Sequence, residues 1–89
     1  MKLRLSDVAK EDLQYWRRTD VEIWKLVKAL IKHTQREPYK GLGRPKALTD
    51  DLKGYWSRRI TAKDRFVYRV RREGRKQFLE ILMCRGHYK

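Results

Sequence analysis

The spacing of the apolar residues changes near the middle of this 89-residue chain, and that change limits the folds that the chain can adopt. Five apolar residues in the first half recur at the three- and four-residue spacing of an amphipathic helix: Ile23, Leu26, Val27, Leu30 and Ile31. From Tyr55 onward, apolar and polar residues alternate in short runs, which is typical of strands. The sequence therefore predicts an α+β fold in which helices come first and strands follow.

A short strand and a first helix are expected at the N-terminus. Residues 2–5 alternate polar and apolar side chains, which favours a strand. Ser6 and Asp7 can then cap a helix that runs to about Arg18. This helix carries a narrow apolar stripe made of Ala9, Leu13 and Trp16.

A second helix is expected to start immediately after the first. Residues 19–22 fit a capping box, in which the Thr19 hydroxyl and the Glu22 carboxylate accept hydrogen bonds from backbone amides. The helix should lay one apolar face on a sheet and end before Pro38. Residues 41–45 contain two glycines and a proline, which resist regular pairing, so they are expected to form a loop.

The second half predicts three consecutive antiparallel strands, at about 56–60, 65–71 and 77–84. Gly74 lies between the last two, where a glycine tolerates the positive φ of a tight hairpin turn. In the middle strand, the period of two gives a core face with Phe66, Tyr68 and Val70, and a cationic face with Arg65, Val67, Arg69 and Arg71.

The length of the chain limits its core and its active site. A chain of 89 residues removes only about 60–65% of its unfolded surface from water when it folds. We therefore expect a single domain over residues 1–89, with one modest core and no deep catalytic cavity. Any active site should be a groove on the surface.

The charge of the chain points to a polyanionic partner. Lys and Arg number 24 against 11 Asp and Glu, which gives a formal charge of +13. Nine of these cations lie between residues 57 and 76, together with only two acidic residues. Arginine forks match phosphate oxygens in pairs, so nucleic acid is the expected ligand. The alternative is that these charges only protect exposed strands from aggregation, but that role predicts a mixture of positively and negatively charged side chains.

Several other classes of protein are disfavoured. No apolar run approaches the roughly 18–20 residues of a membrane span, and the N-terminus lacks the apolar core of a signal peptide, so we expect a cytoplasmic protein without a membrane partner. Cys84 is the single cysteine, and with only His33 and His87 it matches no zinc-ligand spacing. We therefore expect no metal and no cofactor.

The C-terminal tail and a few aromatic residues carry possible chemistry. His87 is a titratable imidazole beside a strand rich in arginine, and Tyr88 has little reason to be buried so close to the end. Tyr55 could stack on a base where cations hold the phosphates, whereas Trp56 and Phe66 are expected to pack in the core. Cleavage of RNA through its own 2′-hydroxyl needs only a base, an acid and cations, and no metal.

The sequence resembles the YoeB/Txe toxins of the RelE superfamily over essentially its whole length. The matching motifs are Gly41-x-Gly43-x-Pro45, Leu48, Leu52, Gly54, Trp56-Ser57-Arg58-Arg59-Ile60, Arg65-x-Val67-Tyr68 and Cys84-Arg85-x-His87-Tyr88. The resemblance implies an α+β fold of two helices packed on a twisted antiparallel sheet, similar to microbial ribonucleases. It also implies an mRNA interferase, an endoribonuclease that cuts mRNA in the A site of the 70S ribosome.

The resemblance further implies roles for individual residues and partners. Arg65 would neutralise the phosphate, His87 would protonate the leaving 5′ oxygen, and Arg59 and Tyr88 would hold and stack the RNA. The basic and aromatic runs add four candidate RNA-binding residues: Arg58, Tyr55, Lys63 and Arg85. The implied partner is an antitoxin of the YefM type, whose acidic segment covers the basic site, and operator DNA is bound only through that complex.

One position departs from the family pattern. The family has a Glu directly after the proline of the glycine-rich loop as the general base, and this chain has Lys46; a family Lys three residues on is Thr49 here. Lys46 could act as the base if neighbouring charge depressed its pKa, as lysines do near this point in RelE-type relatives. Alternatively, Asp50 or Asp51 takes the place of the family Glu as the general base. In the remaining alternative, the chain is an attenuated homologue that binds RNA and ribosomes and represses its operon together with its antitoxin.

Overall fold

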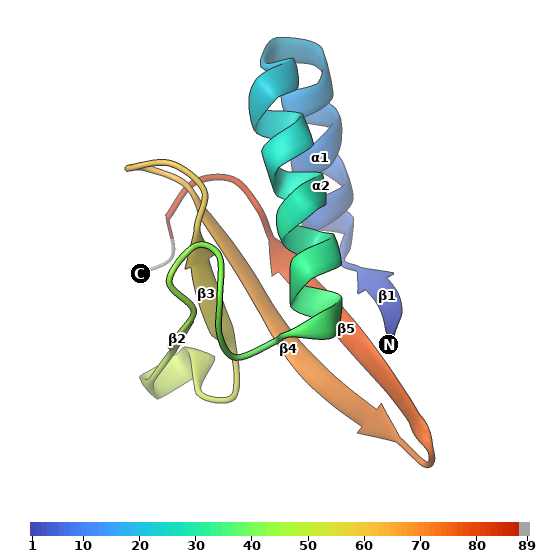
Figure 1. Ribbon diagram of the computed structural model, residues 1–89. Coiled ribbons are helices and arrows are strands. Elements are labelled where there is room, and N and C mark those ends of the chain that lie inside the picture. Colours follow the sequence, from blue (N-terminus) through green and yellow to red (C-terminus); the bar gives the residue numbers. More distant parts are fainter. Residues whose placement is uncertain (88–89) are drawn as a thin grey trace.

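A computed structural model describes residues 1–87 and confirms the α+β architecture (Figure 1). Its elements are, in order, β1 (Lys2–Leu5), α1 (Asp7–Thr19), α2 (Val21–Arg36), β2 (Lys46–Ala47), a 3₁₀ turn (Asp50–Leu52), β3 (Trp56–Arg59), β4 (Arg65–Glu73) and β5 (Lys76–Met83). The five strands form one sheet in the order β1-β5-β4-β3-β2, and the paired helices lie across one face of it. Within residues 1–87, no helix is long and apolar enough to cross a membrane.

The sheet is mixed, which corrects the expectation of a purely antiparallel one. β3, β4 and β5 are consecutive antiparallel neighbours, as predicted, and Gly74 takes a φ of 62° in the hairpin turn. The first strand, however, pairs in parallel with the last one, with Leu3 opposite Leu79. The alternation of side chains identifies a strand but does not reveal its partner or the direction of pairing.

The helix starts differ from the prediction at one of the two positions. Ser6 caps α1 as expected, since its hydroxyl oxygen accepts from the Ala9 amide at 3.0 Å. The cap of α2 is Asp20 rather than Thr19, with the carboxylate accepting from the Ile23 amide at 3.2 Å. Thr19 instead ends α1, and its hydroxyl donates back to the Tyr15 carbonyl at 2.7 Å, so it is not available to a capping box.

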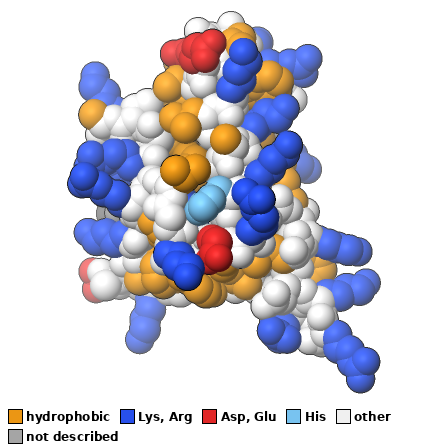
Figure 2. All heavy atoms as spheres, in the orientation of Figure 1, with side chains coloured by type: hydrophobic (Ala, Val, Ile, Leu, Met, Phe, Trp, Pro, Cys, Tyr) orange, Lys and Arg blue, Asp and Glu red, His pale blue; other side chains and the backbone are white. Residues whose placement is uncertain are grey.

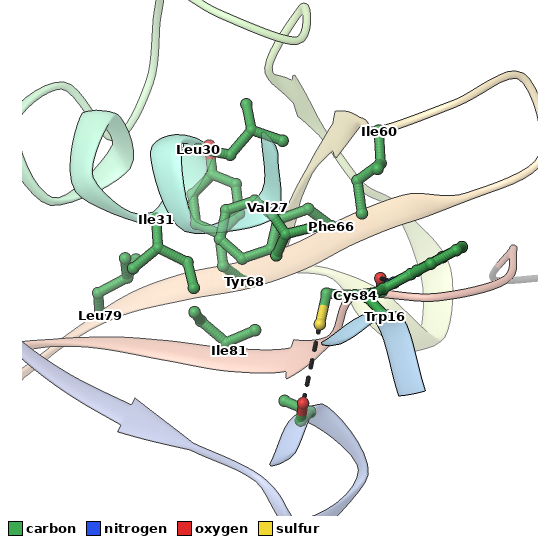
Figure 3. Packing of buried hydrophobic residues seen from close by; sticks show 11 residues of the cluster. Trp16, Val27, Leu30, Ile31, Ile60, Phe66, Tyr68, Leu79, Ile81 and Cys84 are labelled. Carbon is green, nitrogen blue, oxygen red and sulfur yellow. Dashed lines mark hydrogen bonds between the residues drawn. The ribbon is translucent and has the colours of Figure 1, made fainter. Parts of the chain in front are cut away.

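The core lies between α2 and the centre of the sheet (Figure 3). The buried residues of α2 pack against those of β4 and β5, and the main contributors are Val27, Leu30, Ile31, Phe66, Tyr68, Leu79 and Ile81. Leu26, expected on this face, stays 40% exposed. Cys84 is fully buried, and burial together with the nearby Asp12 raises the pKa of its thiol to about 12, so it is unreactive.

The strand face predicted to be cationic is partly apolar and partly neutralised. Val67 is fully buried. The Arg69 guanidinium donates to the Glu80 carboxylate at 2.6 Å, and Arg4 donates to the same carboxylate at 3.2 Å, so Glu80 links β4, β5 and β1. Burial would raise the pKa of Glu80, but the hydrogen bonds from Arg69 and Arg4 outweigh it and hold this pKa below its ordinary value.

Arg58 was predicted to contact RNA, and the structure shows that it is instead a fully buried part of the fold. Its guanidinium donates to the carbonyls of three loop residues and to the Tyr68 hydroxyl: Leu42 at 2.8 Å, Lys40 at 3.1 Å, Glu37, and Tyr68 at 3.2 Å. The Tyr68 hydroxyl in turn donates to the Pro38 carbonyl. Arg58 therefore fastens the 37–43 loop to the sheet and has no surface to offer a ligand.

Replacing Arg58 with Met should lower the free energy of unfolding by about 3 kcal/mol or more, because buried carbonyls lose their donors. Urea denaturation followed by tryptophan fluorescence measures the change. The matched control is Arg59→Met, the exposed neighbour in β3, which should shift stability by no more than about 0.5 kcal/mol. Similar losses in the two variants would contradict the structural role of Arg58.

Candidate functional site

Four of the predicted site residues meet in one surface hollow of about 260 Å³. The lining comes from the 43–46 segment, β3, the start of β4 and the tail after β5: Gly43, Arg44, Lys46, Ser57, Arg59, Arg65 and His87. We call this set the basic hollow. Lys and Arg side chains gather along the left edge of Figure 2, where Figure 1 places the β2 and β3 region. The predicted surface groove is thus present, and it is strongly cationic.

The sheet register places two arginines directly opposite each other at this edge. Arg59 ends β3, and its partner across the ladder is Arg65, the first residue of β4. Like charges in directly opposed positions destabilise a sheet unless an anion lies between or above them. The Nη1 of Arg65 also donates to the Thr61 carbonyl at 2.8 Å, which orients the guanidinium. This arrangement is suited to binding an anion that carries oxygen acceptors.

The tail that carries His87 is fixed to the turn before β4. The Gly86 amide donates to the Asp64 carboxylate at 2.8 Å, and the Arg65 amide donates to the Gly86 carbonyl at 2.8 Å. The other carboxylate oxygen of Asp64 accepts from the Thr61 hydroxyl at 2.7 Å. His87 therefore follows a residue that is held on both its amide and carbonyl sides, and it enters the basic hollow beside Arg65.

The glycine-rich loop forms another wall through a close backbone approach. The Gly43 carbonyl accepts from the Arg59 amide at 2.7 Å, and Gly43 has a φ of 78°. A Cβ at Gly43 would lie 3.0 Å from the Arg58 Cβ and 3.1 Å from the Arg59 carbonyl oxygen. Only glycine fits both the conformation and the space, so this position sets where the next residues, Arg44 and Lys46, reach the hollow.

Besides Gly43, two lining residues were not among the predicted site residues, Ser57 and Arg44. Ser57 lies two residues before Arg59 in β3, so the period of two could have placed it on the same side of the strand. Arg44 follows Gly43 in a loop with a φ of 52°, and no periodicity could have indicated where its side chain goes.

Three other candidates lie outside the basic hollow. Lys63 and Arg85 line a neighbouring depression, where the Arg85 guanidinium lies 4.0 Å from the centre of the Tyr15 ring. Tyr55 lines a different depression beside Arg69, whose guanidinium lies 4.9 Å from its ring. Tyr88 falls outside the described residues.

The chemistry available in the hollow is cationic binding plus one imidazole. Among residues 1–87, no carboxylate lines it, and no group of His, Cys, Asp and Glu side chains could hold a metal ion. Asp50 and Asp51 line a separate depression, to which Lys46 also contributes. The hollow can therefore hold a phosphodiester and supply a proton donor, but no described carboxylate in it can remove a proton.

Comparison with known proteins identifies the family. A family described as the YoeB-like toxin of bacterial type II toxin-antitoxin systems matches residues 5–88. Toxin YoeB of Escherichia coli K12 is 44% identical over 88 residues, which is 99% of this chain and all of that protein. The Streptomyces coelicolor Toxin YoeB is 36% identical over 99% of this chain and all of its own length.

Solved structures agree with this assignment. A YoeB/ParE toxin from Agrobacterium tumefaciens superposes with a TM-score of 0.94 at 46% identity, covering 99% of this chain and all of that one. The toxin in a heterotetrameric YoeB-YefM toxin-antitoxin complex from Staphylococcus aureus superposes with a TM-score of 0.85 at 32% identity, covering 99% and 98% of the two chains. With matching sequence, fold and length, this chain belongs to the YoeB-like toxins of bacterial type II toxin–antitoxin systems.

Proposed function

We propose that this toxin is a ribosome-dependent, metal-independent endoribonuclease that cuts mRNA in the ribosomal A site. The observation that carries the proposal is the meeting of Arg59, Arg65 and His87 in one hollow, with Arg59 directly opposite Arg65 in the β3–β4 ladder. This set can neutralise a phosphate and donate a proton to a leaving oxygen. The family membership supports a ribonuclease reading.

In the proposed reaction, the 2′-hydroxyl of the RNA attacks the adjacent phosphorus and the bond to the 5′ oxygen of the next nucleotide breaks. Negative charge builds on the phosphorane oxygens, where Arg65 and Arg59 stabilise it more strongly than in the starting diester. His87 gives its proton to the leaving 5′ oxygen. The products are a 2′,3′-cyclic phosphate and a free 5′-hydroxyl. From the resemblance, Tyr88 stacks on the RNA.

Lys46 is the unusual feature of this site. It lines the hollow with Arg44, Arg59 and Arg65, and it is exposed to solvent. An ammonium group cannot accept a proton, so we assign Lys46 to phosphate binding and not to proton removal. In this assignment the 2′-hydroxyl is deprotonated by water or by another base, and the chemical step is slower than it would be with a carboxylate at this position.

A second function is favoured by the same absence of a carboxylate from the described lining of the hollow. The protein would then occupy ribosomes or RNA without efficient cutting and act with its antitoxin in repression of the operon. The two functions share the binding groups and differ only in the chemical step.

We also propose a YefM-type antitoxin as the partner, since the Staphylococcus aureus relative is found in complex with YefM. An acidic segment of that antitoxin would cover the basic hollow and compete with RNA phosphates for Arg59 and Arg65. Operator DNA is then reached only through the complex. The proposed ribosomal target places the toxin in the cytoplasm.

His87→Ala should reduce cleavage by about 10²- to 10⁴-fold, the usual contribution of a general acid. Primer extension on an mRNA translated in a purified system measures the codon-phased cuts, with and without ribosomes. The control is His33→Ala, which removes the other histidine, located in α2 outside the hollow. Unchanged cutting by the His87 variant would overturn its assigned role.

Lys46→Glu should increase the rate of cleavage by at least about tenfold, since a general base contributes about 10²- to 10⁴-fold and part of this is offset by the lost cation. Lys46→Gln is the control, because it removes the same charge without adding a base, and it should not accelerate cutting. If Lys46→Glu cuts no faster than the parent protein, a missing carboxylate does not limit the reaction.

Asp64→Ala should lower the cleavage rate about tenfold or more by releasing the Gly86 amide and so loosening His87. Asp64→Asn keeps an oxygen acceptor and should retain most of the activity. The decisive measurement is the cleavage rate of the double variant Asp64→Ala/His87→Ala, which should be no lower than the rate of His87→Ala alone. Additive losses would show that Asp64 does not act through His87.

A further inference from the structure

The end of the β4–β5 hairpin projects beyond the rest of the sheet. β3 pairs with β4 only as far as Tyr68, and β1 pairs with β5 only from Phe78 onward. Residues 71–77 therefore have ladder partners only within the β4–β5 hairpin, where Arg71 pairs with Phe78, Arg72 with Gln77 and Glu73 with Lys76. All seven residues are exposed. In Figure 1 this hairpin extends to the lower right, away from the helices. We call residues 71–77 the hairpin arm.

The hairpin arm is rich in cations that lack ionic partners. It contains Arg71, Arg72, Arg75 and Lys76 against one acid, Glu73. Glu73 already pairs with Arg4 at 3.0 Å and lies 3.8 Å from Arg71. Among residues 1–87, no ion pair includes Arg72, Arg75 or Lys76. Blue side chains mark this end of the molecule at the lower right of Figure 2.

The side-chain types in the hairpin arm indicate which kind of nucleic acid it suits. Single-stranded nucleic acid is usually held by aromatic side chains on which bases stack, and residues 71–77 include none. The nearest aromatic residue in sequence, Phe78, has its ring covered by the Arg4 guanidinium at 3.8 Å. Cations without stacking surfaces suit the phosphate backbone of double-helical RNA, which proteins contact mostly through shape and phosphates.

The arm is also too far from the basic hollow to act on the same phosphate. Arg65 and Arg72 are seven residues apart on β4, which at about 3.3 Å per residue separates them by roughly 23 Å. An RNA that binds the basic hollow and the hairpin arm at the same time must either extend across the sheet or be folded.

We propose that the hairpin arm is a second, sequence-independent docking surface for the phosphate backbone of double-helical RNA. The inference deepens the proposed function, because such a surface would hold the toxin against the folded RNA of its target while the basic hollow engages the single strand. The simpler reading is that these charges only keep an exposed hairpin from aggregating. The two readings differ in what charge removal does to RNA binding.

The test compares two triple variants with the same formal charge. Arg72→Gln/Arg75→Gln/Lys76→Gln alters the arm, whereas Lys10→Gln/Arg18→Gln/Lys32→Gln alters exposed positions on the helices. Binding to a 20-base-pair RNA duplex and to a single strand of the same length is measured by fluorescence anisotropy at several salt concentrations. Circular dichroism confirms that both variants are folded.

The arm variant should bind the duplex at least tenfold more weakly, and the slope of log affinity against log salt should fall by about two to three. The helical variant should lose less than about threefold with little change in slope. Arg72→Lys/Arg75→Lys keeps the charge and should bind like the parent protein.

Equal losses in the two triple variants would overturn the proposal, because they would show only an effect of net charge. A greater loss for the single strand than for the duplex would overturn the assignment to double-helical RNA. His87→Ala retains the arm and should bind the duplex normally, so loss of cleavage in that variant tests the proposed reaction and leaves the docking surface untouched.

Discussion

The buried guanidinium of Arg58 is the interaction on which the geometry of this toxin depends. It gathers the carbonyls of the 37–43 loop and the hydroxyl of Tyr68 around one cation at the centre of the fold. The adjacent Arg59 amide then binds the Gly43 carbonyl, so the same short strand fixes the loop and turns one arginine out toward the basic hollow. Without that fastening, the wall that carries Arg44 and Lys46 would have no fixed position.

Burial and pairing decide what each arginine of this basic chain does. Arg58 is structural because it is enclosed, and Arg69 is largely neutralised because Glu80 lies beside it. Arg59 and Arg65 face each other at an edge with no acid in the described lining of the hollow, which leaves their charge for a ligand. The 24 Lys and Arg residues of the chain are therefore divided among stability, local ion pairing and exposed sites that can bind an anion.

Periodicity in the sequence was enough to predict the two helices, the three antiparallel strands and the hairpin turn, because each depends on local spacing. The parallel pairing of β1 with β5 was missed, since residues 2–5 carry no sign of a partner more than seventy positions away. The meeting of Lys46, Arg59, Arg65 and His87 was anticipated only through resemblance to a family. The prediction that Arg58 binds RNA was wrong because the sequence does not show which of two adjacent strand arginines faces the interior. The alternation of side chains along β3 places Arg58 inside and Arg59 outside.

The parallel pairing of the first and last strands has a consequence for synthesis. Residues 2–5 are synthesised well before residues 78–81, which carry the backbone groups that they bind. The segment that carries His87 is likewise held through Gly86, which is synthesised after its partners Asp64 and Arg65. Until residues 78–87 have been synthesised, a growing chain can therefore form neither the β1–β5 pairing nor the basic hollow.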